Sequence, residues 1–489
     1  MKNHYFAMKA LSACLFFLIL STANVFSQVG IGTVAPETSS MLDVSSTTKG
    51  MLTPRMTTAQ RLAIAAPVDG LMAYDIDLKA FHYYNSSTAI WTVMNSAATG
   101  RLKFKRIRST DVLATVLASE LAAGGNTKYL LDSGTYYEIN GIVTFNHPID
   151  LNNAYLAGQD TNEDVIAKSG NLFEGSTGGS IRNVTLNVTG GAVFNISGVA
   201  TQNLIFRDSV VRNCANVGTI SGLGLVFVSI VQFVGNINGI TYNNINQLLL
   251  SNVGWFGNNQ GTYEKLTGTF GLVQKQGGFS QVEGTAIGFD VAANPVINGD
   301  AVMETVVFTG TLSTGGKYVN GYIVGTYSGY NFNNKWNVRC AGIPTETDLT
   351  ATGDINFDYT VPTAVTTVLT TTAAKLEGGT TSDQLFRFSK IDNNRIAYLG
   401  SKKRFFRVGG SISFQTTADN TNFVFYIAKN GVIINKSKVF VRSNSTVDVL
   451  ALPIQTILEL LTNDYIEIFA ARVNGTGDVK IASINLSAN

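Results

Sequence analysis

Short apolar segments recur through the middle of the chain at a nearly constant spacing. Five of them begin 20, 21, 23 and 24 residues apart, and each is three residues long. They occupy residues 184–186, 204–206, 225–227, 248–250 and 272–274. A short strand repeated at this spacing is typical of a solenoid, because a single coil cannot bury its apolar face but stacked coils can.

Alternation within the segments predicts which side chains form the core. Successive side chains of a strand point to opposite faces, so Leu204 and Phe206 are expected to face inward. Leu225 and Phe227 should lie next to them in the following coil. Asparagine tolerates left-handed backbone and can hydrogen-bond to an equivalent asparagine one coil away. It recurs behind three segments, at Asn216, Asn236 and Asn259. The pattern therefore predicts a right-handed parallel β-helix.

Longer strands follow toward the C-terminus. From Gln384 on, apolar and polar residues alternate in longer runs. Asn430 and Gly431 predict a hairpin turn, because both residues accept positive φ angles. The predicted strands cover 385–388, 406–414, 423–427, 432–434, 439–441, 447–452, 465–473 and 479–486. This many strands joined mostly by short turns predict a jelly-roll sandwich.

The patterning divides the chain into six predicted parts. The fold class is all-β: a right-handed parallel β-helix followed by a jelly-roll sandwich, with a small mixed N-terminal head. A short helix over 110–122 is expected to cap the exposed first coil. In chain order the parts are a signal peptide (1–27), the head (28–94), a linker and capping segment (95–127), the β-helix (128–341), a Thr-rich bridge (342–383) and the jelly roll (384–489).

The first 27 residues have the pattern of a secretory signal. Lys2 and Lys9 supply a basic start, and residues 10–20 form a mostly apolar run of eleven. A membrane-spanning helix needs about 20 apolar residues, so this run is too short to anchor the chain. Cleavage is expected between Ser27 and Gln28. The mature protein is thus predicted to be secreted or held at the outer cell surface, with no membrane span.

Composition agrees with an extracellular all-β protein. Of the 489 residues 45% are hydrophobic and only 14% are charged, with 48 glycines and 8 prolines. Without Lys2 and Lys9 the chain has 33 basic and 33 acidic residues, so its neutral charge gives no reason to expect a nucleic-acid partner. The two cysteines of the mature chain, Cys214 and Cys340, fall in different predicted coils or domains. Buried free thiols are therefore expected, although a disulfide is possible.

The head carries a specific series of motifs. Residues 28–33 read QVGIGT, residues 54–61 read PRMTTAQR, and residues 70–74 read GLMAY. This series resembles the tail-fibre-like head module at the start of many secreted and surface proteins of Bacteroidetes bacteria. The resemblance covers about 65 residues and implies no activity. A module this small would gain from packing against copies of itself, so a trimerising or anchoring head is predicted, with a simple spacer as the alternative.

Local signals predict the elements of the head. Short strands are expected at 50–53 and 71–74, and Thr57 can cap a helix over 58–65. Two further segments, 81–84 and 90–93, are expected to form a hairpin.

Two further resemblances concern the rest of the chain. Residues 129–137, 145–149 and 153–158 resemble the opening coils of the pectate-lyase-like β-helix superfamily, which includes bacteriophage tailspikes. That superfamily contains polysaccharide lyases, glycoside hydrolases and non-catalytic adhesins, so the resemblance implies fold more than function. Residues 409–414, 429–431 and 463–468 resemble the tumour-necrosis-factor-like jelly roll. The latter resemblance implies a homotrimer whose tip binds receptors or glycans.

No catalytic residues are predicted. Hydrolases of this kind use paired carboxylates, and equivalent positions in adjacent coils lie about 4.8 Å apart. Asp208 is aligned with Ser229 and Asn252, so an acidic ladder is absent. The two mature histidines, His82 and His147, have no zinc spacing.

Weak candidates for ligand binding remain. Asp160, Glu163 and Asp164 are close in sequence and could hold calcium, although a polar loop explains them as well. Trp255 and Tyr263 could form a platform on which a sugar stacks, although core filling is the favoured interpretation. No other cofactor is expected.

Two functions are compatible with these features. The favoured one is a fibre-like structural or adhesion protein that binds carbohydrate or a surface receptor through the β-helix grooves or the jelly-roll tip. The alternative is a polysaccharide depolymerase, either a lyase or a glycoside hydrolase of the tailspike type. The missing carboxylate ladder favours the first, so enzymatic activity is left open and is not the preferred prediction.

Overall fold

The structure is a computed structural model that describes residues 2–21, 28–94, 103–357 and 365–489. It divides into two compact units, Met1–Arg101 and Leu102–Asn489. Ser27 at the predicted cleavage point, residues 95–102 of the linker and residues 358–364 of the Thr-rich bridge lie outside the described residues. Helix α1 spans Lys2–Ser21. None of the helices in the described ranges is both long and apolar enough to cross a membrane.

The head contains a two-stranded sheet and a four-stranded sheet. β1 (Val29–Ile31) pairs in parallel with β2 (Leu42–Val44). The second sheet has the order β3 (Arg55–Met56), β4 (Met72–Asp75), β5 (Ala80–Asn85) and β6 (Ile90–Val93).

Local sequence signals of the head are mostly confirmed. Thr57 begins helix α2 (Thr58–Leu62) through a capping box with Gln60, and β5 and β6 form the predicted hairpin. The strand expected at 50–53 is wrong, because pairing starts only at Arg55. A buried ion pair, Arg61 Nε to Asp75 Oδ2 at 2.9 Å, ties α2 to β4.

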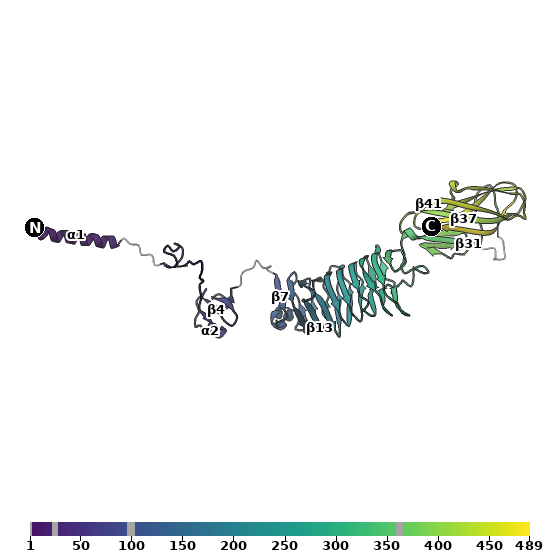
Figure 1. Cartoon of the computed structure of the whole chain (residues 1–489). Helices are drawn as coiled ribbons and strands as arrows, with labels where there is room; N and C mark the ends of the chain where they lie inside the picture. The colour runs from purple at the N-terminus through teal and green to yellow at the C-terminus, as the bar shows by residue number, and fades with distance from the viewer. Residues whose placement is uncertain (1, 22–27, 95–102, 358–364) are drawn as a thin grey trace. The chain divides into compact units, whose positions relative to one another are not determined.

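Residues from Phe104 to Ala341 form a parallel β-helix (Figure 1). Its strands stack in register from coil to coil, in a sheet of thirteen strands and a second sheet of nine. The first contains β7 (Phe104–Arg108), β9 (Tyr136–Asn140), β10 (Ile142–Phe145), β12 (Tyr155–Ala157), β13 (Val165–Ser169), β15 (Gly179–Arg182), β16 (Thr185–Thr189), β18 (Asn203–Arg212), β20 (Leu225–Val234), β22 (Gln247–Trp255), β25 (Leu272–Gln281), β28 (Ala301–Thr309) and β30 (Trp336–Ala341). The second contains β8 (Tyr129–Leu130), β11 (Ile149–Asp150), β14 (Phe173–Gly175), β17 (Ala192–Ser197), β19 (Asn216–Ser221), β21 (Ile240–Asn243), β23 (Thr262–Thr267), β26 (Ile287–Asp290) and β29 (Lys317–Asn320).

The predicted alignment of the apolar segments is wrong by one residue at Leu225 and at Leu272, and residues 184–186 align with 209–211 instead of 204–206. Leu204 and Phe206 are buried as expected, but they pair with Val226 and Val228. Leu225 and Phe227 therefore face outward and are only partly covered. A one-residue shift reverses every side chain of a strand. Alternation could not reveal the error, because both faces of β20 are apolar.

The predicted asparagine ladder is confirmed for two of its three residues. The backbone and side-chain N–H groups of Asn236 both donate to Asn259 Oδ1 at 2.9 Å. Asn216 is exposed instead, and the backbone N–H of Cys214 donates to Asn236 Oδ1 at 3.0 Å in its place. Because the ladder is buried, its amides satisfy backbone groups that water cannot reach.

Cys214 and Cys340 are free thiols; Cys214 is buried as expected, whereas Cys340 is only half-buried. Burial raises the pKa of Cys214 to about 11, so its thiol does not ionise at neutral pH. The first coil is covered by two short helices, α3 (Leu113–Val116) and α4 (Ala118–Ala123), where one was predicted. Leu113 and Leu117 join the buried core of the β-helix, which is how these helices cap it.

The C-terminal part is a sandwich of two antiparallel sheets (Figure 1). One sheet contains the order β31-β43-β37-β41 and the other contains β36-β42-β38, with β40 beyond β38, which is the strand order of a jelly roll. The strands are β31 (Thr352–Phe357), β32 (Val365–Thr367), β33 (Ala374–Lys375), β34 (Leu385–Phe386), β35 (Phe388–Asp392), β36 (Arg395–Tyr398), β37 (Arg404–Thr416), β38 (Thr421–Lys429), β39 (Val432–Ile433), β40 (Val439–Ser443), β41 (Leu450–Leu460), β42 (Tyr465–Asn474) and β43 (Val479–Ala488).

The sandwich has the predicted hairpin turn, but it begins earlier in the chain than predicted. The predicted hairpin turn is confirmed, since Asn430 and Gly431 have φ angles of 54° and 76° between β38 and β39. β31 and β33 lie inside the segment predicted as a Thr-rich bridge, and they pair with β43 and β42. The apolar side of β31 is short, because only Ile355 and Phe357 are buried apolar residues there and they alternate with Asp354 and Asn356.

Candidate functional site

One edge of the β-helix is a column of residues with left-handed backbone. Each long strand bends at such a residue. Beyond the bend, the second half of the strand pairs in the row that begins with β10, β13 and β16. The φ angles are 52° at Asn183, 50° at Asp208, 54° at Ile230, 51° at Asn252, 65° at Gly277 and 58° at Thr305. Asparagine, aspartate and glycine accept this conformation readily, whereas isoleucine and threonine do so at a cost.

The column corrects the alignment of Asp208. Its counterpart in the next coil is Ile230 and not Ser229, since Arg207 pairs with Ser229 and Ser209 pairs with Val231. The predicted correspondence with Asn252 two coils away is confirmed by the register of β20 and β22.

A polar hollow of about 430 Å³ lies beside this column. It is lined by Gln159, Asp160, Thr161, Asn183, Asp208, Ser209, Val210, Ile230 and Gln232. Three of these residues carry side-chain amides, two carry hydroxyls and two carry carboxylates. Amides both donate and accept hydrogen bonds, so the lining suits a ligand rich in hydroxyl groups.

Both carboxylates of the hollow already accept hydrogen bonds within the chain. Arg207 Nε donates to Asp208 Oδ2 at 2.8 Å. The backbone N–H of Asn162 donates to Asp160 Oδ1 at 2.8 Å. The two acids therefore sit in polar surroundings of the kind that orient a ligand.

The three acids predicted as a cluster do not act together. Asp164 is buried and accepts hydrogen bonds from the backbone N–H groups of Gly141, Gln159 and Asp160, at 2.8, 2.6 and 3.0 Å. Its carboxylate thus orders a turn, and only Asp160 lines the hollow, while Glu163 is exposed outside it. Within the described ranges no group of three or more His, Cys, Asp or Glu could hold a metal ion.

The sugar platform predicted from Trp255 and Tyr263 is wrong. Both side chains are 0% exposed, and their rings stack with centroids 5.1 Å apart. Phe233 stacks on the other face of Trp255 at 4.0 Å. The left-handed residue Asn252 shifts the alternation within β22, so Trp255 points inward together with Leu250.

Sequence reasoning missed Ile230. It is 54% exposed, lines the hollow and holds a φ angle of 54°, which costs a β-branched residue about 1–2 kcal/mol. In the sequence, Ile230 could have been recognised as an isoleucine at a position where the neighbouring coils have Asp208 and Asn252. That alignment requires the true register, which the apolar pattern misplaced by one residue.

A second hollow of about 500 Å³ lies at the capped end of the β-helix. Glu120 in its wall accepts hydrogen bonds from Lys105 Nζ at 2.6 Å and from the hydroxyls of Tyr137 and Ser119 at 2.8 Å. Burial alone would raise the pKa of Glu120, but these donors outweigh it and lower that pKa. Burial raises the pKa of Tyr137 far above its usual range. Glu120 therefore stays anionic and cannot serve as a general acid.

Comparisons with known proteins give one family match and several similar solved structures. Residues 30–109 match a family described as a phage tail-like trimerisation region. No curated protein matches the chain significantly. Among solved structures, rabbit GITRL is 12% identical and covers 28% of this chain and 91% of its own, with a TM-score of 0.18. Pika GITRL is 11% identical and covers 28% and 95%, also with a TM-score of 0.18.

A phage protein is also among the similar structures. The enzymatically active domain of tailspike protein 4 from bacteriophage CBA120 is 11% identical and covers 89% of this chain and 77% of its own, with a TM-score of 0.23. Identities and TM-scores this low carry no argument about activity. What the comparisons do support is that the head, together with β7, is similar to a phage tail-like trimerisation region.

Proposed function

We propose that the chain is one protomer of a homotrimeric, fibre-like protein, secreted or held at the outer cell surface. The observation that carries this proposal is the solvent exposure of apolar side chains in the β1–β2 sheet. Val29, Ile31 and Leu42 are 54%, 56% and 52% exposed, although all three are apolar. An isolated two-stranded sheet is not stable in water, so these side chains need a surface to pack against. The matched region, residues 30–109, supports further copies of the chain as that surface.

The mass of the chain in solution tests the trimer. Light scattering of residues 28–489 after size exclusion is expected to give three times the mass of one chain. Ile31→Asp combined with Leu42→Asp should shift most of the protein to single chains, because charges would then sit on the face that must be buried. Val199→Asp is the matched control, since Val199 is 61% exposed on a turn of the β-helix and should leave the mass unchanged. An unsubstituted chain with the mass of one copy would overturn the proposal.

In this proposal the trimer binds carbohydrate at the hollow beside the left-handed column. Amides from Gln159, Asn183 and Gln232 would meet sugar hydroxyls, and Ile230 would meet the apolar face of a pyranose ring. Ile230 supports this view because the fold itself favours asparagine, aspartate or glycine at its position. A strained residue retained in a binding hollow is a reason to expect a role there.

Ile230→Asn is expected to stabilise the protein and weaken its ligand binding. The free energy of unfolding should rise by about 1 kcal/mol, because asparagine accepts the left-handed conformation. Retention on immobilised bacterial surface polysaccharides should fall several-fold. Ile237→Asn is the matched control, since Ile237 is 52% exposed and neither lines the hollow nor has a positive φ. Unchanged retention for Ile230→Asn would remove the hollow from the proposed function.

A depolymerase remains the alternative because Asp160 and Asp208 line the same hollow. Binding is preferred, since both carboxylates accept hydrogen bonds within the chain. Release of reducing ends or of unsaturated sugar absorbance from a retained polysaccharide would reverse that preference. In that case Asp160→Asn and Asp208→Asn should abolish the release.

A further inference from the structure

The outward face of the thirteen-stranded sheet carries an apolar column. Strand register places one outward residue of each coil next to that of the following coil. We call this column the outer stripe; it consists of Phe104, Tyr136, Tyr155, Ser180, Ile205, Phe227, Leu249, Gln274 and Val302. Seven of these nine residues are apolar or aromatic, over a length of roughly 38 Å at about 4.8 Å per strand, and the column then ends on the polar Asn337 in β30.

The nine-stranded sheet of the same β-helix carries a polar outward column for comparison. Leu130 of the terminal strand β8 is apolar, whereas the outward residues from β14 to β29 are in register from coil to coil and all polar. They are Glu174, Asn195, Thr219, Thr241, Lys265, Asp290 and Asn320. Strands with one face in water normally alternate apolar inside and polar outside. The outer stripe departs from that rule while the other sheet follows it, so water alone does not explain the stripe.

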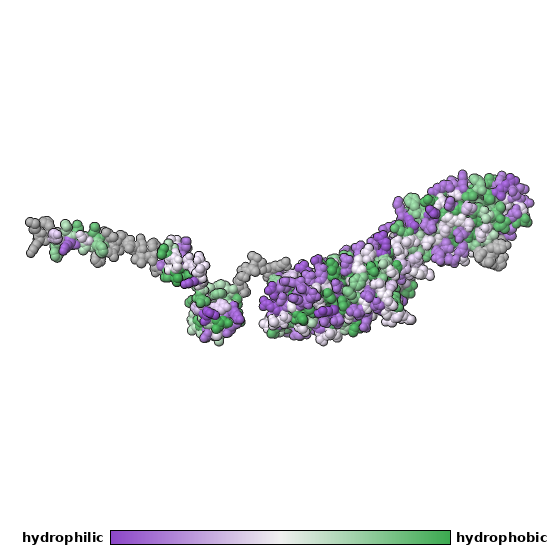
Figure 2. Space-filling view, viewed as in Figure 1, coloured by the Kyte–Doolittle hydropathy of each residue, from purple (hydrophilic) through white to green (hydrophobic). Residues whose placement is uncertain are grey.

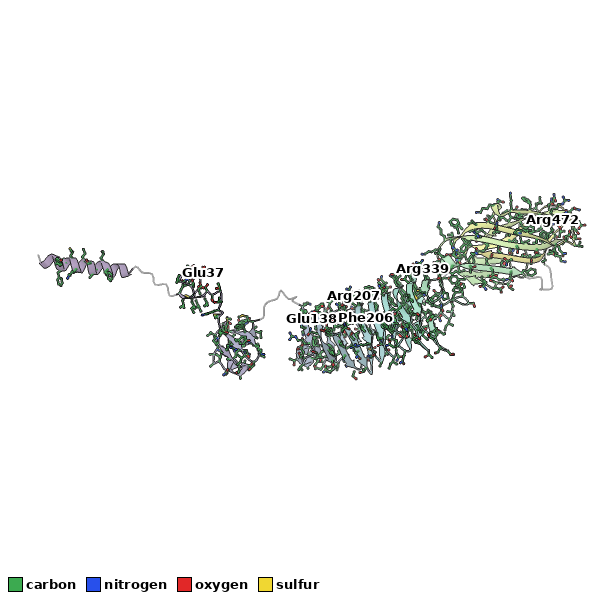
Figure 3. All side chains as sticks on the ribbon, in the orientation of Figure 1. Glu37, Glu138, Phe206, Arg207, Arg339 and Arg472 are labelled. Carbon is green, nitrogen blue, oxygen red and sulfur yellow. The ribbon has the colours of Figure 1, made fainter. Side chains whose placement is uncertain are left out.

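The surroundings of the outer stripe are those of an interface. Tyr155 is 51% exposed and Phe104 is 38% exposed, and Phe227 and Leu249 are partly exposed. Apolar residues reach the visible surface of the coil stack (Figure 2). A parallel column of charged and polar residues runs beside the stripe and includes Glu138, Arg207 and Arg339 (Figure 3). An apolar centre with a charged rim is the usual anatomy of a protein–protein interface.

We propose that the outer stripe is the surface through which the β-helices of the three copies pack against one another. This inference rests on the proposed homotrimer. The matched trimerisation region ends at residue 109 and so includes β7, whose Phe104 is the first residue of the stripe. The Phe104 ring stacks on that of Tyr136 in the next coil, with centroids 5.9 Å apart. The stripe thus begins inside the matched region and extends from it along eight further coils, which identifies a second copy of this chain as its occupant.

Cross-linking between chains tests the outer stripe directly. Tyr155→Cys and Phe227→Cys each place a thiol on the stripe in residues 28–489, which lack the exposed Cys14. A short bifunctional maleimide should then link two chains covalently, at least tenfold more than in Thr219→Cys, whose thiol lies on the polar column of the nine-stranded sheet. The unsubstituted chain is the background control, because Cys214 is buried and Cys340 is half-buried.

The outcomes separate the outer stripe from the trimer itself. A mass of three chains with cross-links only from Tyr155→Cys and Phe227→Cys supports both proposals. If the mass is that of three chains but the three cysteine variants cross-link equally, or none of them cross-links, the outer stripe is not the interface. The homotrimer itself would still stand. A mass of one chain overturns both. Phe227→Glu checks the occupant: a trimer unchanged in heat stability, with reduced retention on polysaccharide, would show that a glycan covers the stripe and would also overturn the proposal.

Discussion

Replacing Lys275 with methionine is expected to destabilise the β-helix by about 3–5 kcal/mol, although Lys275 touches no ligand surface. Its Nζ atom lies 2.7 Å from Glu264 Oε2 inside the coils, and both side chains are only 1% exposed. Trp255 Nε1 donates to the other oxygen of Glu264 at 3.1 Å. Removing the lysine would leave a buried carboxylate with one neutral hydrogen bond and no counter-ion. An isolated charge in such surroundings is far costlier than the pair.

A double variant shows whether the loss of stability comes from leaving one charge of the Glu264–Lys275 pair unpaired. Glu264→Leu should cost about as much as Lys275→Met, while the two together should be neutral or stabilising by about 1–4 kcal/mol, because no charge is then buried. Denaturant unfolding at one fixed protein concentration gives the four values of the cycle.

A matched control lies on the same strand as Glu264. Lys265→Met removes a lysine whose side chain is 42% exposed and whose ion pair with Asp290 spans 3.7 Å, so its effect should stay below about 1 kcal/mol. Single variants as mild as Lys265→Met would show that the buried pair contributes little.

The repeat pattern of the sequence predicts the fold but not the register of its strands. A period of 20 to 24 residues was enough to predict the parallel β-helix, since only stacked coils bury such short strands. The period did not predict the register. β20 is apolar on both faces, so Leu225 and Val226 were equally good partners for Leu204 by pattern alone. The ambiguity has a physical cause in the outer stripe, whose outward residues look like core residues in sequence.

The candidate site was predicted only in part for the same reason. Asp160 was identified as a candidate from its polar loop, and it lines the hollow. Asp208 and Ile230 join it only when the register is known. Trp255 was misplaced because a left-handed residue at Asn252 breaks the two-residue alternation. A sequence pattern cannot show a bend produced by one φ angle, particularly where the column also contains isoleucine and threonine.

The connection between the β-helix and the sandwich was beyond sequence reasoning altogether. It is organised by Arg387, which is 1% exposed. Its guanidinium contacts the carboxylate of Asp348 and the carbonyl of Trp336 in β30, and donates to the carbonyl of Glu346 at 3.0 Å. Asp348 also accepts from the Ser401 hydroxyl at 3.0 Å and from the backbone N–H of Lys402 at 2.9 Å. The partners of Arg387 are 39 to 51 residues away in sequence, so no local pattern marks them.

Arg387→Met is therefore expected to lower the free energy of unfolding by about 3–5 kcal/mol, since it leaves Asp348 buried without a counter-ion and removes one donor each from the carbonyls of Trp336 and Glu346. Arg339→Met is the matched control. Arg339 also belongs to the end of the β-helix, but its side chain is 68% exposed and lies 3.7 Å from Glu304, so its loss should cost less than about 1 kcal/mol. Calorimetry should show the loss, and limited proteolysis should cut Arg387→Met faster between the β-helix and the sandwich, where its contacts converge. Equal proteolysis of the two variants would mean that the connection is held by the apolar contacts around Phe386 and Tyr330, whose rings stack at 4.0 Å, and not by the arginine.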